Sequence, residues 1–397
     1  MASHTNGEAL PLLGLTRPQR IHYVDNLRAS LTVLLIFHHA AVECTLSNLP
    51  MHIFININKA ALWGLFFFVS GYSSTLALGS STDLQFLVSR MVKIGLPAWV
   101  YAVIGHRLLF IVLTVLWSDV FGNTVPGWVY SLLSGPVVYV FYLLLMDCAH
   151  LGARWWKREW PDSIPSVLTS VFRPSSQQQF YTSIELAAIA LALYIFVSCL
   201  GIQIPLLSIY RFLSNDFPSF DAPVAYAIAY VVGVNFPQIQ SDYMNITSSR
   251  GYGTLCISLL VSSSSLTIAQ QLSTSLHQFI QLRDQYFFVN AGLNPHTAFY
   301  AIWCTFVFLT IPYSVVSIFS RSSWANREWG FLARHTYIQM YVNMIPILVA
   351  VHYTRWVGDV FLRVVVVGMI GVVVSWIGML GGLLLWMKVS PRLQRQT

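Results

Sequence analysis

Long apolar runs dominate the chain, and short polar connections separate them. A run of about 17–25 apolar residues is long enough to cross a bilayer as a helix. Ten such runs follow one another, near 27–43, 60–79, 94–117, 128–148, 183–202, 222–236, 252–272, 297–319, 331–353 and 359–387. The pattern predicts an all-α, polytopic integral membrane protein with about ten transmembrane helices.

Composition agrees with this class of protein. Hydrophobic residues make up 56% of the chain and charged residues only 9%, whereas soluble domains carry about 25% charged residues. The net charge of +7 would suggest a nucleic-acid partner in a soluble protein, but in a membrane protein we interpret it as a topology signal and expect no nucleic acid. The five cysteines lack a C-x-x-C spacing, so we predict neither a metal site nor a disulfide framework.

The basic residues predict how the chain crosses the bilayer. Alternate connections on one side hold sixteen of the 22 Lys and Arg residues, and those on the other side hold five. The positive-inside rule therefore places both termini in the cytoplasm. We expect a polar tail at 1–24, a single membrane-embedded domain at 25–388 and a basic tail at 389–397. The longest cytoplasmic connection, 149–182, mixes basic residues with tryptophans, as at a bilayer interface.

The first apolar run carries a stripe of ionisable residues. On a helix, Arg28 and His39 point within about 20° of one another, and His38 points about 80° away from Arg28. Asp25 falls near the same stripe. Ionisable groups inside a bilayer are costly and usually functional. The alternative is a packed bundle in which these polar groups are paired internally.

Four local patterns, in one order, resemble the acyltransferase-3 family of multipass membrane acyltransferases, and particularly its fungal-type members. The patterns are D-N-L-R at 25–28 with H-H at 38–39, F-F-F-V-S-G-Y at 66–72, F-L-V-S-R-M-V-K-I-G-L-P at 86–97 and S-G-P-V-V-Y-V-F-Y-L-L-L-M-D at 134–147. The chain departs from the family pattern at Lys93, where a second arginine is usual, and at Val138, where tryptophan is usual. Asn343 stands where the family usually has a histidine.

The resemblance implies roles for two groups of residues. Arg28 and His39 match the arginine and the essential histidine of the family's first helix. We therefore assign the catalytic base to His39, and His38 and Asp25 are further catalytic candidates beside it. Neutral histidine is the usual base near pH 7, which suits acyl transfer to a hydroxyl.

For the donor, the resemblance implies acyl-CoA arriving from the cytosol. Arg90 and Lys93 are the candidates for binding its phosphates, and Ser70 and Tyr72 could line the cavity or bind a carbonyl oxygen. Arg90 and Lys93 also fit a purely topological role, and Ser70 and Tyr72 also fit a helix-end turn. His106 and Arg107 are second-line candidates because they lie inside the third apolar run. Glu43 fits best as a surface carboxylate.

We therefore predict an O-acetyltransferase that uses acetyl-CoA and acylates a hydroxyl of a hydrophobic small molecule, such as a terpenoid or polyketide secondary metabolite. Its setting is a lipid bilayer, which in a eukaryote would be the endoplasmic reticulum or another internal membrane. One alternative is acylation of a glycan or lipid hydroxyl. The alternative from another class is a transporter that uses the polar stripe as a substrate or proton path.

The charge asymmetry predicts that tags at both termini and in the 149–182 connection are accessible from the cytosol, because positively charged connections are retained there. Protease protection of tagged protein in sealed microsomes measures this. Glycosylation of an engineered C-terminal tail would contradict the predicted orientation.

Overall fold

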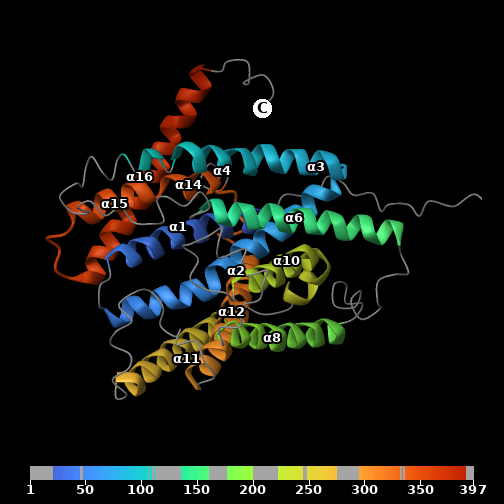
Figure 1. Cartoon of the computed structure of the whole chain (residues 1–397), viewed down its shortest axis with the longest axis horizontal. Coiled ribbons are helices and arrows are strands. Elements are labelled where there is room, and N and C mark those ends of the chain that lie inside the picture. The colour runs from blue at the N-terminus through green and yellow to red at the C-terminus, as the bar shows by residue number, and fades with distance from the viewer. Residues whose placement is uncertain are drawn as a thin grey trace, which may run out of the picture.

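The computed structural model describes residues 21–44, 48–105, 107–109, 111, 136–160, 177–199, 222–244, 248–274, 295–330, 333 and 336–389. Helices make up every regular element in these ranges, and no strand occurs among them, which confirms the all-α class. Figure 1 shows α1, α6, α8 and the α3–α4 segment with their long axes in roughly the same direction.

The described part of the chain contains fourteen helical elements. In chain order they are α1 (His22–Cys44), α2 (Leu49–Gly79), α3 (Asp83–Arg90), η1 (Met91–Gly95), α4 (Leu96–Val100), η2 (Tyr101–Gly105), α6 (Pro136–Glu159), α8 (Gln177–Cys199), α10 (Ala222–Met244), α11 (Ser248–Thr274), α12 (Pro295–Arg321), α14 (Thr336–Val342), α15 (Met344–Tyr353) and α16 (Val360–Val389).

Seven of the described helical segments are long and apolar enough to cross a membrane. They are His22–Cys44, Leu49–Gly79, Asp83–Leu109, Pro136–Glu159, Ser248–Ala269, Ala298–Arg321 and Val360–Gly381. Shorter apolar helices at Glu185–Phe196, Val224–Pro237 and Met344–Tyr353 coincide with three further predicted runs. The chain is thus an integral multipass membrane protein, while the count of ten and the cytoplasmic termini stay predictions.

Several helices extend beyond the apolar runs that predicted them. The side chain of Asn48 accepts a hydrogen bond from the Met51 amide and starts α2 there, eleven residues before the predicted run at 60–79. Lys59 therefore lies inside a helix, not in a connection. Likewise α6 continues to Glu159, so the first part of the predicted 149–182 connection is helical. The apolar runs miss these ends because backbone hydrogen bonding continues into polar sequence.

The segment from Asp83 to Gly105 contains two π-helical stretches, η1 and η2, on either side of the short helix α4. Pro97 lies in α4 and has no N–H to donate to a preceding carbonyl. Single π-turns commonly interrupt α-helices at such irregularities and at functional sites. The helix that carries Arg90 and Lys93 therefore begins regularly, with a Thr82–Gln85 capping box, and becomes irregular from Met91.

Close contact between α2 and α10 sets the centre of the bundle. A Cβ atom added to Gly71 of α2 would overlap the carbonyl oxygen of Tyr230, and one added to Gly233 of α10 would overlap that of Phe68. Small residues let membrane helices approach until their backbones touch. The rings of Phe67 and Tyr226 stack beside this contact, with centroids 4.5 Å apart. The two glycines thus set the short separation between α2 and α10 across which the polar side chains of the two helices form hydrogen bonds.

We expect Gly233→Ala to destabilise the protein by about 1–3 kcal/mol, the usual effect of overpacking. The reason is that the added methyl has no space beside Phe68. The thermal unfolding midpoint in detergent measures the change. Gly253→Ala is the matched control, because Gly253 is exposed on α11 and a Cβ there meets nothing within 4 Å. Equal midpoints for the two variants would contradict the backbone contact.

Candidate functional site

Arg28, from the predicted stripe of ionisable residues, lies in the second turn of α1 and contacts three other side chains. The Nη2 atom of Arg28 donates a hydrogen bond of 2.6 Å to the Ser73 hydroxyl of α2, and its Nη1 atom lies 3.9 Å from the Asp25 carboxylate. The guanidinium also lies over the Tyr337 ring of α14, 5.5 Å from its centroid. The Arg28 side chain is only 16% exposed. Three helices thus converge on one cation.

A second arginine is paired inside the bundle. The Arg90 Nε atom lies 3.3 Å from Oδ2 of Asp147, a residue of α6 with no exposed surface. The Ser74 hydroxyl accepts from Arg90 and donates to Oδ1 of Asp147 at 2.7 Å, and the Tyr230 hydroxyl donates to the same oxygen at 2.5 Å. This network joins α2, α3, α6 and α10, and it satisfies a carboxylate that would otherwise be very costly to bury.

The two arginines belong to one polar layer, because Ser73 and Ser74 are consecutive residues of α2. One turn earlier, the Ser70 hydroxyl makes a 2.7 Å hydrogen bond with the hydroxyl of Tyr139 from α6. We call this set the arginine layer. It consists of Asp25, Arg28, Ser70, Ser73, Ser74, Arg90, Tyr139, Asp147 and Tyr230.

The four residues predicted to bind the donor lie in different surroundings. Ser70 and Arg90 lie in the arginine layer and bond to other residues of it. Tyr72 is only 2% exposed and packs against the ring of Phe236, 5.7 Å away. Lys93 alone is exposed, although only three residues separate it from Arg90. The four residues therefore do not converge on one open surface, and their donor-binding role stays a prediction.

The two histidines lie deeper along α1. Because the helix is continuous, the offset of eleven positions from Arg28 to His39 corresponds to about 16 Å along its axis. The His38 and His39 rings are 5.7 Å apart. His38 is buried, with 6% of its surface exposed, and its Nδ1 atom has no hydrogen-bond partner; His39 is partly exposed. Lys59 lies on α2, which packs against α1.

The remaining candidates lie apart from these groups. Arg107 and Glu43 are exposed, and Glu43 is in the last turn of α1. His106 lies outside the described residues. Within the part of the chain that the structure describes, no three His, Cys, Asp or Glu side chains gather as a metal site would require.

Sequence reasoning missed six members and neighbours of the arginine layer: Ser73, Ser74, Tyr139, Asp147, Tyr230 and Tyr337. A signal for two of them was present, since the hydroxyl run S-G-Y-S-S-T at 70–75 is unusual within an apolar helix. Serines that face neighbouring helices in a membrane bundle often bond across them. The tyrosines gave no comparable signal, because their helices are rich in aromatic residues that pack without polar partners.

Removing the carboxylate alone should leave Arg90 buried and unpaired. We expect Asp147→Leu to destabilise the protein by about 3–5 kcal/mol, and we expect the double variant Arg90→Leu/Asp147→Leu to recover most of that loss. Thermal unfolding in detergent, with both single variants and the double variant, measures the coupling. Additive losses would mean that the two side chains do not stabilise one another.

Comparison of this chain with family models, with curated proteins and with solved structures finds no match. The similarity to the acyltransferase-3 family therefore consists of the four ordered motifs. Within the structure, residues from all four motifs contribute to the arginine layer, namely Arg28, Ser70, Arg90, Tyr139 and Asp147.

Proposed function

We propose that this protein is a membrane-bound O-acyltransferase, with both termini in the cytosol, that transfers an acetyl group from acetyl-CoA to a hydroxyl of a hydrophobic small molecule. The observation that carries this proposal is the pair of adjacent histidines in the last third of α1. The Nδ1 atom of His38 is buried without a partner, and His39 is partly accessible. Ionisable groups at such depth in a membrane bundle usually have a function.

In the proposed reaction, the neutral imidazole of His39 removes the proton of the acceptor hydroxyl as its oxygen attacks the thioester carbonyl. The carbon–sulfur bond then breaks. The imidazolium returns its proton to the departing thiolate, so the products are the acetyl ester and CoA with a free thiol. His38 packs against His39 and helps to shape the acceptor side of the site.

The distance between Arg28 and His39 suits this donor. Acetyl-CoA carries its phosphates at one end and its thioester at the far end of a flexible pantetheine arm. A cation near the start of α1 and a base about 16 Å deeper can therefore engage the two ends of one molecule. Arg28, fixed by Ser73 and Asp25, is the binding group for the polar end in this proposal. Lys93 adds an exposed positive charge to the same helix as Arg90.

One observation favours a second candidate, a transporter with a proton path. His52 and Lys59 lie inside α2, which packs against α1, the helix that carries His38 and His39, so two neighbouring helices both carry ionisable groups. Chains of ionisable residues within a bundle are typical of proton relays. In that case membranes containing the protein would move protons or substrate across sealed vesicles without consuming acetyl-CoA.

Membranes that contain the protein, incubated with radiolabelled acetyl-CoA and a panel of terpenoid and polyketide alcohols, test the proposal. Labelled ester above the level of membranes without the protein is expected. Absence of label with every acceptor, together with acetyl-CoA-independent uptake into vesicles, would favour the transporter.

Histidine variants separate the roles of the two rings. We expect His39→Ala to lower kcat by about 10²–10⁴-fold, the usual contribution of a positioned base, and His38→Ala to cost less. His52→Ala is the matched control, because His52 is a partly buried histidine of α2 outside the proposed reaction. Initial rates on folded, membrane-inserted protein measure the effects. Loss of turnover in His38→Ala with activity retained in His39→Ala would overturn the assignment of the base.

A further inference from the structure

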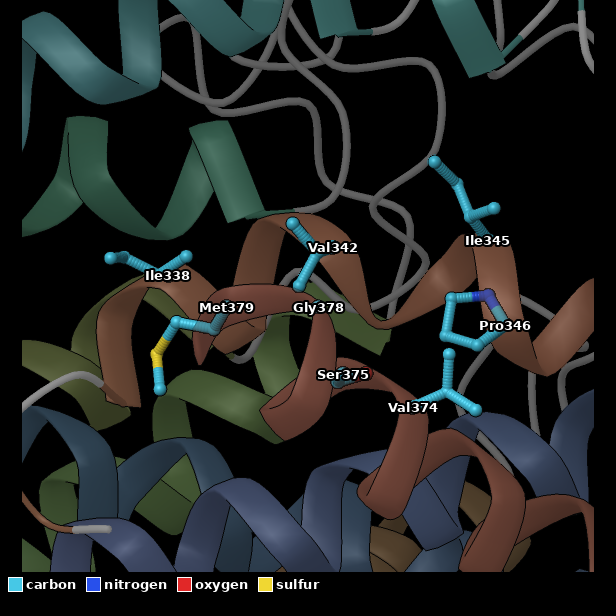
Figure 2. A pocket seen from close by; sticks show the side chains of 8 residues that line it. All are labelled: Ile338, Val342, Ile345, Pro346, Val374, Ser375, Gly378 and Met379. Carbon is cyan, nitrogen blue, oxygen red and sulfur yellow. The ribbon is translucent and has the colours of Figure 1, made fainter. Parts of the chain in front are cut away.

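A cavity of about 500 Å³ lies between α14, α15 and α16 (Figure 2). Its lining consists of Ile338, Val342, Ile345, Pro346, Val374, Ser375, Gly378 and Met379. Ser375 contributes the only polar side chain among these residues, and none of them is charged. Ligand sites in proteins are typically apolar cavities of this size with a few polar groups. The cavity is separate from the arginine layer.

The register of the helices places a second polar side chain opposite Ser375. The Gln339 amide nitrogen lies 3.1 Å from the Met379 sulfur, and Ile347 packs against Gly371. One turn is about four residues. Moving one turn forward from Gln339 and one turn back from Met379 gives Asn343 and Ser375, and one further turn on each side gives Ile347 and Gly371.

The same helical register continues from α14 into α15. The Asn343 amide donates to the Gln339 carbonyl at 3.1 Å, and the Ile347 amide donates to the Asn343 carbonyl at 3.2 Å. These are helical hydrogen bonds, so the backbone does not break at Asn343. Asn343 and Ser375 therefore occupy the same layer of the antiparallel pair formed with α16.

Both side chains are buried without hydrogen-bond partners. Asn343 is 1% exposed and Ser375 is 2% exposed. The Oδ1 and Nδ2 atoms of Asn343 and the Oγ atom of Ser375 all lack a partner. An unsatisfied buried polar group costs about 1–3 kcal/mol. Ser375 lines the cavity, and Asn343 lies in the same layer, next in sequence to the lining residue Val342 but not itself in the lining. Three unsatisfied atoms in one layer at the edge of a cavity are a feature of a binding site.

We propose that this cavity binds an uncharged, lipophilic molecule that carries a hydroxyl or carbonyl group. The apolar lining holds its hydrocarbon body, and Ser375 and Asn343 bond to its oxygen. An amide and a hydroxyl can each donate and accept, so they satisfy either group. If the proposed function holds, on which this step rests, the bound molecule is the acyl acceptor. Acetyl-CoA is a poor occupant, because its phosphates would meet no cation among the lining residues.

Two further observations concern the setting of the cavity. Ile338, Ile345 and Val374 are 38–47% exposed, so the cavity is open on one side and a molecule can enter it. On the inner side, Ile36 of α1 packs against Gly371, one turn from Ser375. Phe37 packs against Gly368, so α1 runs antiparallel to α16, and His39 lies on the other side of Ile36 from Ser375. The cavity and the histidines are thus linked through the packing of α1 on α16 but are not adjacent.

Photolabelling with a defined probe tests the site without acetyl-CoA. The probe is farnesol that carries a diazirine and an alkyne, and its matched control is the same hydrocarbon without the hydroxyl. We expect the alcohol to label peptides of α14–α16 in purified protein. We expect unlabelled farnesol to compete with it, and the hydrocarbon to label these peptides about fivefold less, as the loss of one hydrogen bond predicts.

A cavity-filling variant tests the location. Gly378 lines the cavity, and a Cβ added there meets nothing within 4 Å, so Gly378→Leu fills the space without touching the backbone (Figure 2). Gly381→Leu is the matched control, because Gly381 is exposed on the same helix, has equal space and does not line the cavity. We expect labelling to fall at least about tenfold in Gly378→Leu, a loss of about 1.4 kcal/mol of binding, and to be unchanged in Gly381→Leu.

The polar pair is tested with Asn343→Leu and Ser375→Ala. If these groups await a ligand, both variants should label more weakly while their thermal unfolding midpoints stay equal to or above that of the unsubstituted protein, because an unpaired polar group is removed. A lowered midpoint in both variants would show that the polar groups have a structural role and would overturn the proposal.

The outcomes also separate this site from the proposed reaction. Labelling that responds to Gly378→Leu establishes the site even if no acetyl transfer is found, in which case only the acyltransferase proposal fails. Acetyl transfer with an unchanged acceptor KM and unchanged labelling in Gly378→Leu would leave the acyltransferase proposal in place and overturn the cavity as the acceptor site.

Discussion

A buried ion pair constrains how this helical bundle is assembled. Asp147 has no exposed surface, so Arg90, Ser74 and Tyr230 must all reach it for the carboxylate to be tolerated inside the membrane domain. Each partner comes from a different helix. The separation and rotation of α2, α3, α6 and α10 are therefore coupled, and the glycine contact between α2 and α10 sets the close approach that lets Ser74 and Tyr230 share one oxygen.

The polar groups of the bundle differ in whether they have partners inside the protein. In the arginine layer, the buried atoms without a hydrogen bond, Nε of Arg90 and Oδ2 of Asp147, form an ion pair at 3.3 Å, whereas His38 and the Asn343–Ser375 layer contain buried atoms without partners. Paired networks hold helices together, and unsatisfied groups raise the free energy of the unliganded state. This contrast separates the Arg90–Asp147 network from the parts of the protein where a second molecule is expected to bind, which in the proposed function include Arg28.

Much of the fold could be predicted from the sequence, and less of the site. Apolar runs predicted where helices lie because hydrophobicity is a local property, but the start of α2 at Leu49 depends on the Asn48 cap, which a hydropathy average does not register. Helical register correctly placed Arg28, His38 and His39 on one continuous helix. The pairing of Arg90 with Asp147 depends on long-range packing, and the opposition of Asn343 and Ser375 depends on the register between two helices, so neither could be read from local spacing.

The Arg90–Asp147 pair has a consequence for how the chain is made. Arg90 leaves the ribosome well before Asp147, and Tyr230 follows much later. An unpaired guanidinium is costly at membrane depth. Until α6 has been made, the segment that begins at Asp83 lacks the carboxylate that pairs with Arg90. Stable burial of Arg90 therefore requires both segments, and neither can reach its final position in the bundle without the other.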